Sequence, residues 1–132
     1  MQMISKNKLS GIFKAMNEEK NLQKAERNFE VEDKVCVLID KLKDNYETWA
    51  ISAKIGQKQV DKFNTGFDVR PGNKYIKIIN SGSVWGFICL YDDHKFNRGD
   101  ILKPAGFNAP ARNFARGNVF KLESYNAVWT GA

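Results

Sequence analysis

Residues 74–91 are KYIKIINSGSVWGFICLY, and this stretch decides the fold. Two runs rich in β-branched and aromatic side chains, residues 74–79 and 84–91, flank the polar segment Asn80-Ser81-Gly82-Ser83. Such runs are typical of strands, and the segment between them has the composition of a tight turn. The stretch therefore predicts a β-hairpin. Alternation along its first strand places Ile76 and Ile78 on one face of the sheet. It places Tyr75, Lys77 and Ile79 on the opposite face.

Further short strands are predicted toward the C-terminus. The runs that fit are Ile101–Lys103, Val119–Leu122 and Ala127–Thr130. Upstream of the hairpin, Arg70-Pro71-Gly72-Asn73 has the chemistry of a turn, in which proline sets φ and glycine accepts a positive φ. Together with the hairpin, these runs predict about five short strands, enough for an antiparallel sheet or a small partly open barrel.

The N-terminal half has helical periodicity. Apolar residues recur at i, i+3, i+4 and i+7, namely at Leu9, Ile12, Phe13 and Met16. This pattern predicts a first helix from about Ser5 to about Arg27, with Ser5 or Asn7 as its N-cap. The second apolar segment, residues 35–42, fits a helix or a short buried strand, and we favour the helix. A third helical segment is predicted from Trp49 to Asn64 or Thr65, ending on a left-handed Gly66.

The expected fold is α+β, with N-terminal helices packed on a C-terminal antiparallel sheet of about five short strands. We expect one domain over residues 1–132, mainly helical over 1–65 and mainly β over 66–132. A short helix is predicted near 109–116, because Asn108 is a suitable N-cap and Gly117 a suitable C-terminal glycine. In that helix Arg112 and Arg116 would share one face.

Composition narrows the functional classes. The chain has 132 residues, of which 42% are hydrophobic and 27% charged, values typical of a folded globular protein. No apolar run approaches the length of a membrane span, and the N-terminus lacks an apolar signal core. Cys36 and Cys89 lie in apolar stretches without CxxC spacing, so we expect buried free thiols and no metal site.

Positive charge is concentrated in one C-terminal segment. The net charge is +6, and Asp100 is the one acidic residue between Lys95 and Lys121. This segment holds six basic residues: Lys95, Arg98, Lys103, Arg112, Arg116 and Lys121. Such a cluster attracts a polyanion such as nucleic acid, although the same charge also serves as a solubilising face.

The stretch from Ser83 onward resembles a group of small uncharacterised tailed-bacteriophage proteins. The resemblance lies in residues 83–88 (SVWGFI), 99–112 (GDILKPAGFNAPAR) and 116–118 (RGN), and covers about the last 50 residues. The chain departs from the group's pattern at Gly106-Phe107, where a small polar residue and a tryptophan are expected. The resemblance implies a phage-encoded protein in the cytoplasm of an infected bacterial host. It implies no activity.

An enzymatic function has few candidate residues. His94 is the single histidine, and it follows Asp92-Asp93 in a segment that we interpret as a solvated loop. Phosphate-binding P-loop, hydrolase-elbow, zinc-protease and EF-hand motifs are absent from the sequence. We therefore expect no cofactor and favour a non-enzymatic function, with a cryptic enzyme as the third choice.

A binding function has more candidates. Basic residues beside aromatic rings can form a stacking platform for single-stranded nucleic acid, and we expect Tyr75 and Phe114 to be exposed there. A host-protein partner is the alternative, since arginine and aromatic side chains also anchor protein interfaces. A purely structural role remains for the two arginines, through pairing with Asp92, Asp100 or Glu123. The candidate binding residues are Tyr75, Lys77, Lys95, Arg98, Lys103, Arg112, Phe114 and Arg116.

Overall fold

The computed structural model describes the backbone of residues 6–132 and the side chains of residues 16–132. The chain divides into two compact units, Met1–Glu30 and Val31–Ala132. The N-cap candidate Ser5 and the side chains of Leu9, Ile12 and Phe13 lie outside the described residues. Met16 is the one residue of the predicted apolar stripe whose side chain is described, and it is exposed.

Two helices form the N-terminal half, where three were predicted. Helix α1 (Lys6–Ser52) runs through the expected end at Arg27, and Asn7 lies inside it. Residues 35–42 belong to α1, which confirms the helical alternative for that segment. The third predicted segment is wrong as one helix: the chain leaves α1 after Ser52, and α2 (Gln57–Thr65) begins after an extended Gly56. Gly66 ends α2 with a φ of −87°, so the predicted left-handed conformation is also wrong.

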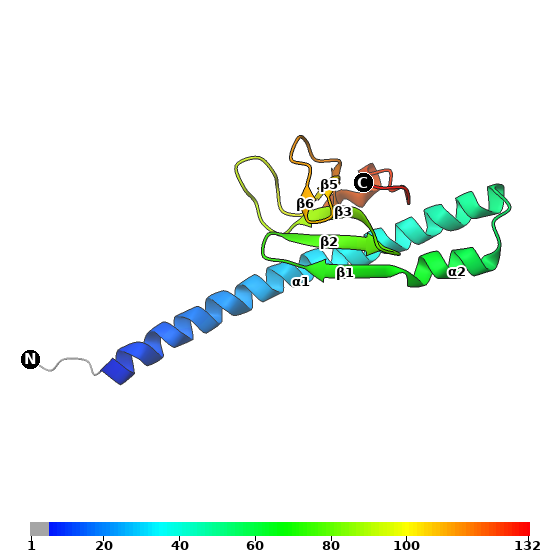
Figure 1. Cartoon of the computed structure of the whole chain (residues 1–132). Coiled ribbons are helices and arrows are strands. Elements are labelled where there is room, and N and C mark those ends of the chain that lie inside the picture. Colours follow the sequence, from blue (N-terminus) through cyan, green and yellow to red (C-terminus); the bar gives the residue numbers. More distant parts are fainter. Residues whose placement is uncertain (1–5) are drawn as a thin grey trace, which may run out of the picture. The chain divides into compact units, whose positions relative to one another are not determined.

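The β part is a five-stranded antiparallel sheet with no closed barrel, in the order β1-β2-β3-β4-β7. Beside it lies a small two-stranded sheet, β5-β6 (Figure 1). The strands of the main sheet are β1 (Phe67–Pro71), β2 (Tyr75–Asn80), β3 (Ser83–Cys89), β4 (Asp100–Leu102) and β7 (Gly117–Asn118). The strands of the small sheet are β5 (Pro104–Gly106) and β6 (Ala109–Pro110). The expected α+β fold is confirmed.

The hairpin predicted from residues 74–91 is confirmed as β2 and β3. Its register pairs Ile76 with Ile88 and Asn80 with Ser83. Ser81 and Gly82 have φ values of 48° and 83°. Positive φ at both central residues is the type I′ turn, whose twist matches that of the two strands it joins.

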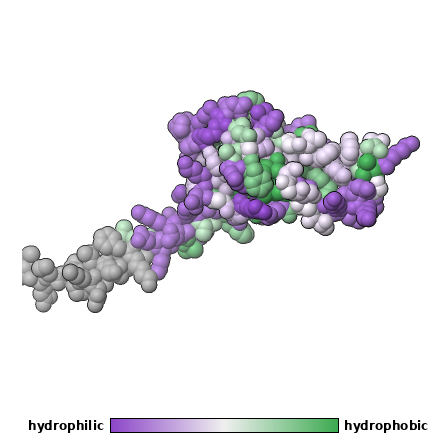
Figure 2. Space-filling model, viewed as in Figure 1, coloured by the Kyte–Doolittle hydropathy of each residue, from purple (hydrophilic) through white to green (hydrophobic). Residues whose placement is uncertain are grey.

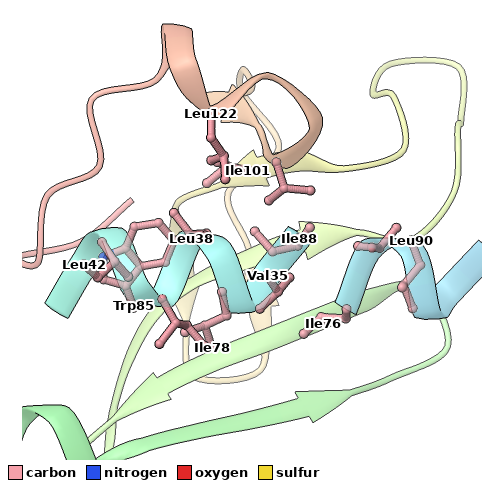
Figure 3. Close-up of a cluster of buried hydrophobic side chains, with 13 residues drawn as sticks. Val35, Leu38, Leu42, Ile76, Ile78, Trp85, Ile88, Leu90, Ile101 and Leu122 are labelled. Carbon is pink, nitrogen blue, oxygen red and sulfur yellow. The ribbon is translucent and has the colours of Figure 1, made fainter. Parts of the chain in front are cut away.

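The main core lies between α1 and one face of the sheet, within the Val31–Ala132 unit. Val31, Val35, Leu38 and Leu42 follow one another at intervals of three or four residues and are all fully buried. Figure 3 shows Val35, Leu38 and Leu42 pointing toward Ile76, Ile78 and Ile88 of the hairpin. This arrangement explains the helix, because the buried positions, which include Ile39, recur with a period of 3.6. Cys36 lies on the opposite side of the helix and is exposed. The expectation of a buried Cys36 is therefore wrong, whereas Cys89 is buried as expected.

The C-terminal segments differ most from the prediction. Val119–Ser124 form a 3-10 helix, η1, instead of a strand. Asn118 caps η1 by accepting a hydrogen bond from the Phe120 amide at 2.8 Å, and the i, i+3 pair Val119 and Leu122 is buried in the core. Residues 127–130 are not a strand either. The Trp85 indole N–H donates to the Val128 carbonyl at 2.9 Å, and the Trp129 amide donates to Asn45 at 2.9 Å.

The helix predicted near 109–116 does not form. Its first residues, Ala109–Pro110, are strand β6. The Ala111 amide then donates to the Lys103 carbonyl, and the Arg116 amide donates to the Ile101 carbonyl, each at 2.7 Å. Because these amides bond to neighbouring extended segments, no i to i−4 hydrogen bonds are made, and Arg112 and Arg116 do not share a helical face. Across residues 6–132, no helix has both the length and the apolar character needed to cross a membrane.

We expect Leu38→Ala to lower the free energy of unfolding by about 2–5 kcal/mol, because it opens a cavity in the core between α1 and the hairpin. The matched control is Val37→Ala, one residue away on the solvent side of α1, which we expect to change stability by less than about 0.5 kcal/mol. Urea denaturation followed by circular dichroism measures both. Equal losses would show that the helix does not pack on the sheet through Leu38.

Candidate functional site

The second face of the sheet, opposite α1, carries its own small core. Its buried members are Phe87, Cys89, Phe96 and Leu102, with Tyr75, Val84 and Ala115 packed against them. Tyr75 and Phe87 alternate along their strands with Ile76 and Ile88, which face α1. Helix α1 covers the first face, and loops cover the second. Most of the predicted site residues lie on those loops.

The loop between β3 and β4 is built by three carboxylates. One oxygen of Asp93 accepts hydrogen bonds from the Lys95 and Phe96 amides at 2.8 and 2.7 Å. Asp92 accepts from the Arg98 amide at 2.7 Å, and Asp100 accepts from the Asn97 amide at 2.8 Å. These carboxylates are engaged as backbone caps. His94 sits between them as an exposed loop residue, and the described side chains contain no cluster of metal-ligating groups.

Arg112 joins the segment after β6 to this loop and to β2. Its guanidinium donates to the second oxygen of Asp93 at 2.8 Å and to the Tyr75 hydroxyl, and it lies 4.8 Å from the centre of the Phe96 ring. The hydrogen bond from Arg112 holds the pKa of Asp93 well below its ordinary value, assisted by the two loop amides. The same bond to Asp93 raises the pKa of Arg112. Arg112 thus has the structural role that the sequence left open, although its partner is none of the three expected acids.

Tyr75 is part of the same network and is not the exposed platform that the sequence predicted. Its ring is half-buried and packs edge to face against Phe87, with 6.1 Å between the ring centres. Its hydroxyl accepts a hydrogen bond from Arg112. The prediction failed because alternation gives the face of the sheet on which Tyr75 lies but does not show that loops cover that face.

Lys77, which is half-buried, pairs with the exposed Phe107 near Tyr75. The Lys77 ammonium donates to the Asn108 side chain at 2.9 Å and lies 4.2 Å from the centre of the Phe107 ring. Phe107 is 48% exposed and was not among the predicted site residues. Its position in a turn, with Gly106 and Asn108 on either side, was the available signal.

Two more arginines stack on exposed rings near β7. The Arg116 guanidinium lies 3.8 Å from the centre of the Phe114 ring, and that of Arg98 lies 4.9 Å from the centre of the Phe120 ring. Phe114 is 55% exposed, as predicted, and Phe120 is 36% exposed. Gly99, with a φ of 88°, makes room for Phe120, since a Cβ there would lie 2.6 Å from that ring.

The remaining predicted residues, Lys95 and Lys103, are exposed. The Lys95 ammonium lies 5.7 Å from the centre of the Phe96 ring, on which Arg112 also stacks. Within residues 16–132, none of Lys77, Lys95, Lys103 and Arg116 forms an ion pair. The structure therefore brings Tyr75, Lys95 and Arg112 together around Phe96, and it pairs Lys77, Arg98 and Arg116 with separate rings.

A pocket of about 190 Å³ opens beside this network, but its chemistry does not indicate catalysis. Its walls include Tyr75, Cys89, Tyr91, Asp92 and Asp93. Burial raises the pKa of the Cys89 thiol to about 12, and the charges of Asp100 and Asp93 act in the same direction. A thiol in this state is a weak nucleophile.

We expect Asp93→Asn to reduce stability at neutral pH and to flatten its dependence on acid. Because the folded-state pKa of Asp93 is depressed, its contribution is present above the unfolded value of about 3.9 and is lost as the pH falls below it. The difference in Tm between the wild type and Asp93→Asn should therefore be larger at pH 7 than at pH 3. A difference that stays constant between these two pH values would contradict the assignment.

The two cysteines should differ in reactivity. We expect a thiol reagent such as dithionitrobenzoate to modify one cysteine per folded chain, the exposed Cys36, and to modify Cys89 only in denaturant. In the Cys36→Ser variant the rapid reaction should disappear. Rapid labelling of that variant in the folded state would show that Cys89 is accessible.

Comparison with known proteins identifies the family of this chain but assigns no function to it. No curated protein and no solved structure matches the chain. One family model matches residues 13–132, which includes the whole sheet, both of its faces and every predicted site residue. The chain therefore belongs to DUF7717, a family of unknown function.

Proposed function

We propose that this protein is a small non-enzymatic accessory protein, phage-derived, that binds single-stranded nucleic acid through a basic-aromatic surface. We define this surface by the predicted basic residues other than Arg112, which has a structural role, and by the exposed rings of the same segments. Its members are Lys77, Lys95, Arg98, Lys103, Phe107, Phe114, Arg116 and Phe120.

The observation that carries the proposal is the pairing of exposed rings with cations. Phe107, Phe114 and Phe120 are large apolar side chains that stay at the surface, and each has a basic group within 5 Å of its ring centre. Proteins that bind single strands without sequence preference combine these same two components: cations track the phosphates, and rings stack on the bases.

The electrostatic balance of the surface also favours an anionic ligand. Asp93 is paired with Arg112 and with two amides, and both oxygens of Asp100 accept hydrogen bonds, one from Asn97 and one from Asn118. These acids are therefore held on the loop side of the surface and pair with none of its lysines. Figure 2 shows one face of the molecule, on which hydrophilic residues surround a smaller hydrophobic patch.

The test is a fluorescence-anisotropy titration with labelled single- and double-stranded oligonucleotides of one sequence, at 50 and 200 mM salt. We expect tighter binding to the single strand, because only unpaired bases can stack. If four cations contact phosphates, affinity should fall about 50-fold between these two salt concentrations. We expect Phe107→Ala and Phe114→Ala to weaken single-strand binding by about tenfold each, which is the scale of one stacked base.

The matched control is Ile51→Ala, which removes an exposed apolar side chain from α1, outside the basic-aromatic surface. It should leave affinity unchanged. Equal affinity for single and double strands, together with no loss in the two phenylalanine variants, would show that the rings do not stack on bases. Absence of binding at 50 mM salt would show that the proposed function is wrong.

A host protein is the second candidate partner, and one observation favours it. Tyr46, Trp49, Phe63 and Trp129 form a cluster of packed rings from α1, α2 and the C-terminal segment, and Trp49 remains exposed. Tryptophan and tyrosine are enriched at the energetic centres of protein interfaces. Binding of this kind should respond weakly to salt, so the titration series separates it from nucleic-acid binding.

A further inference from the structure

A hollow of about 260 Å³ lies between β7 and η1, at one end of the basic-aromatic surface. The side chains on its walls that can donate hydrogen bonds are Arg116, Lys121, Ser124 and Tyr125, and Asp100 and Asn118 also line it. Lys121 and Tyr125 were not among the predicted site residues. Lys121 lies in η1, where a strand was predicted, and Tyr125 follows η1 directly.

Arg116 has donors that no other group uses. The face of its guanidinium is stacked on Phe114, while its Nε is buried without a hydrogen-bond partner among the described residues. A guanidinium carries five N–H donors in a planar fork that matches a phosphate. Stacking on the Phe114 ring fixes the plane of this fork, and Arg116 lines the hollow.

The acid in the hollow does not neutralise Arg116. One oxygen of Asp100 accepts from the Asn97 amide at 2.8 Å, and the other accepts from the Asn118 side chain at 3.0 Å. Asn118 in turn donates to the Arg98 carbonyl at 2.9 Å and accepts from Phe120 at 2.8 Å. These groups are engaged with one another, so the two cations of the hollow have no ion-pair partner in residues 16–132.

Tyr125 completes the set of donors. Its ring packs on Gly117, where a Cβ would lie 2.5 Å from a ring atom, so the approach depends on glycine. Burial raises the pKa of Tyr125, although Arg116 acts in the opposite direction. The phenol is therefore protonated at neutral pH, and its hydroxyl makes no hydrogen bond to the described residues.

We propose that this hollow is a phosphate-binding subsite in which Arg116, Lys121 and Tyr125 hold one phosphate group. The inference rests on the proposed function in one respect: in a bound strand, the base next to that phosphate would stack on the outer face of Phe114. Two kinds of phosphate have this chemistry, a diester of the strand backbone and a terminal monoester.

The first experiment uses inorganic phosphate and does not depend on nucleic acid. Titration into ¹⁵N-labelled full-length protein should shift the Nε–H resonance of Arg116 in a saturable way. We expect Lys121→Gln to weaken phosphate binding by about tenfold, and Tyr125→Phe, which removes a single hydroxyl, to weaken it several-fold. The matched control is Lys58→Gln, which removes the same charge from an exposed lysine of α2, outside both the hollow and the basic-aromatic surface, and should change binding by less than twofold.

The second experiment identifies the source of the phosphate. One oligonucleotide is compared with and without a 5′-phosphate, against wild type and Lys121→Gln. A gain from the 5′-phosphate that disappears in Lys121→Gln indicates a terminal monoester. If the 5′-phosphate makes no difference and Lys121→Gln lowers both affinities more than Lys58→Gln does, the group bound is a backbone diester.

The outcomes separate the two proposals. If oligonucleotides bind but phosphate leaves Arg116 unchanged and Lys121→Gln behaves like Lys58→Gln, the subsite is wrong and the proposed function stands. If phosphate shifts Arg116 but no oligonucleotide binds, the subsite stands and the proposed function is wrong. If Lys58→Gln reduces the phosphate response as much as Lys121→Gln does, the response reflects general attraction by the net charge, and the subsite is wrong.

Discussion

The structure depends on the burial of one apolar stripe of α1 against one face of a small sheet. Val31, Val35, Leu38 and Leu42 cover Ile76, Ile78 and Ile88, and within the Val31–Ala132 unit no second layer of helices covers the other face. Loop segments cover this second face and its small core. They are the loop from Asp92 to Asp100 and the segment from Lys103 to Arg116, which carry most of the basic residues after residue 65.

Covering a sheet with loops creates a need for polar anchors, because extended loop backbone has few partners of its own. Asp92, Asp93 and Asp100 meet that need by accepting hydrogen bonds from loop amides. Arg112 then links Asp93 to Tyr75 on β2. Arg112 and Asp93 are thereby paired with each other. Lys77, Lys95 and Arg116 lie beside rings and form no ion pair within residues 16–132.

The position of cations beside exposed rings bears on the function of the protein. A basic segment alone is ambiguous between solubility and polyanion binding, but cations fixed beside exposed rings resemble the components of single-strand binding surfaces. The hollow between β7 and η1 adds donors that the fold itself does not use. Membership of DUF7717 extends over residues 13–132, so the loops and the hollow fall within the region that defines the family.

The sequence by itself determined the hairpin of residues 74–91 and the α+β class, and it favoured a helix over a strand for residues 35–42, because these depend on periodicity and turn chemistry over short distances. Only the tertiary structure decided the arrangement of the residues after β3. Whether Arg112 binds a ligand or Asp93, and whether residues 119–124 are a strand or η1, depends on groups that are far apart in the chain. Periodicity indicates which residues are buried, but it carries no information about which partner an amide or a charged side chain meets, and the proposed binding surface depends on those long-range contacts.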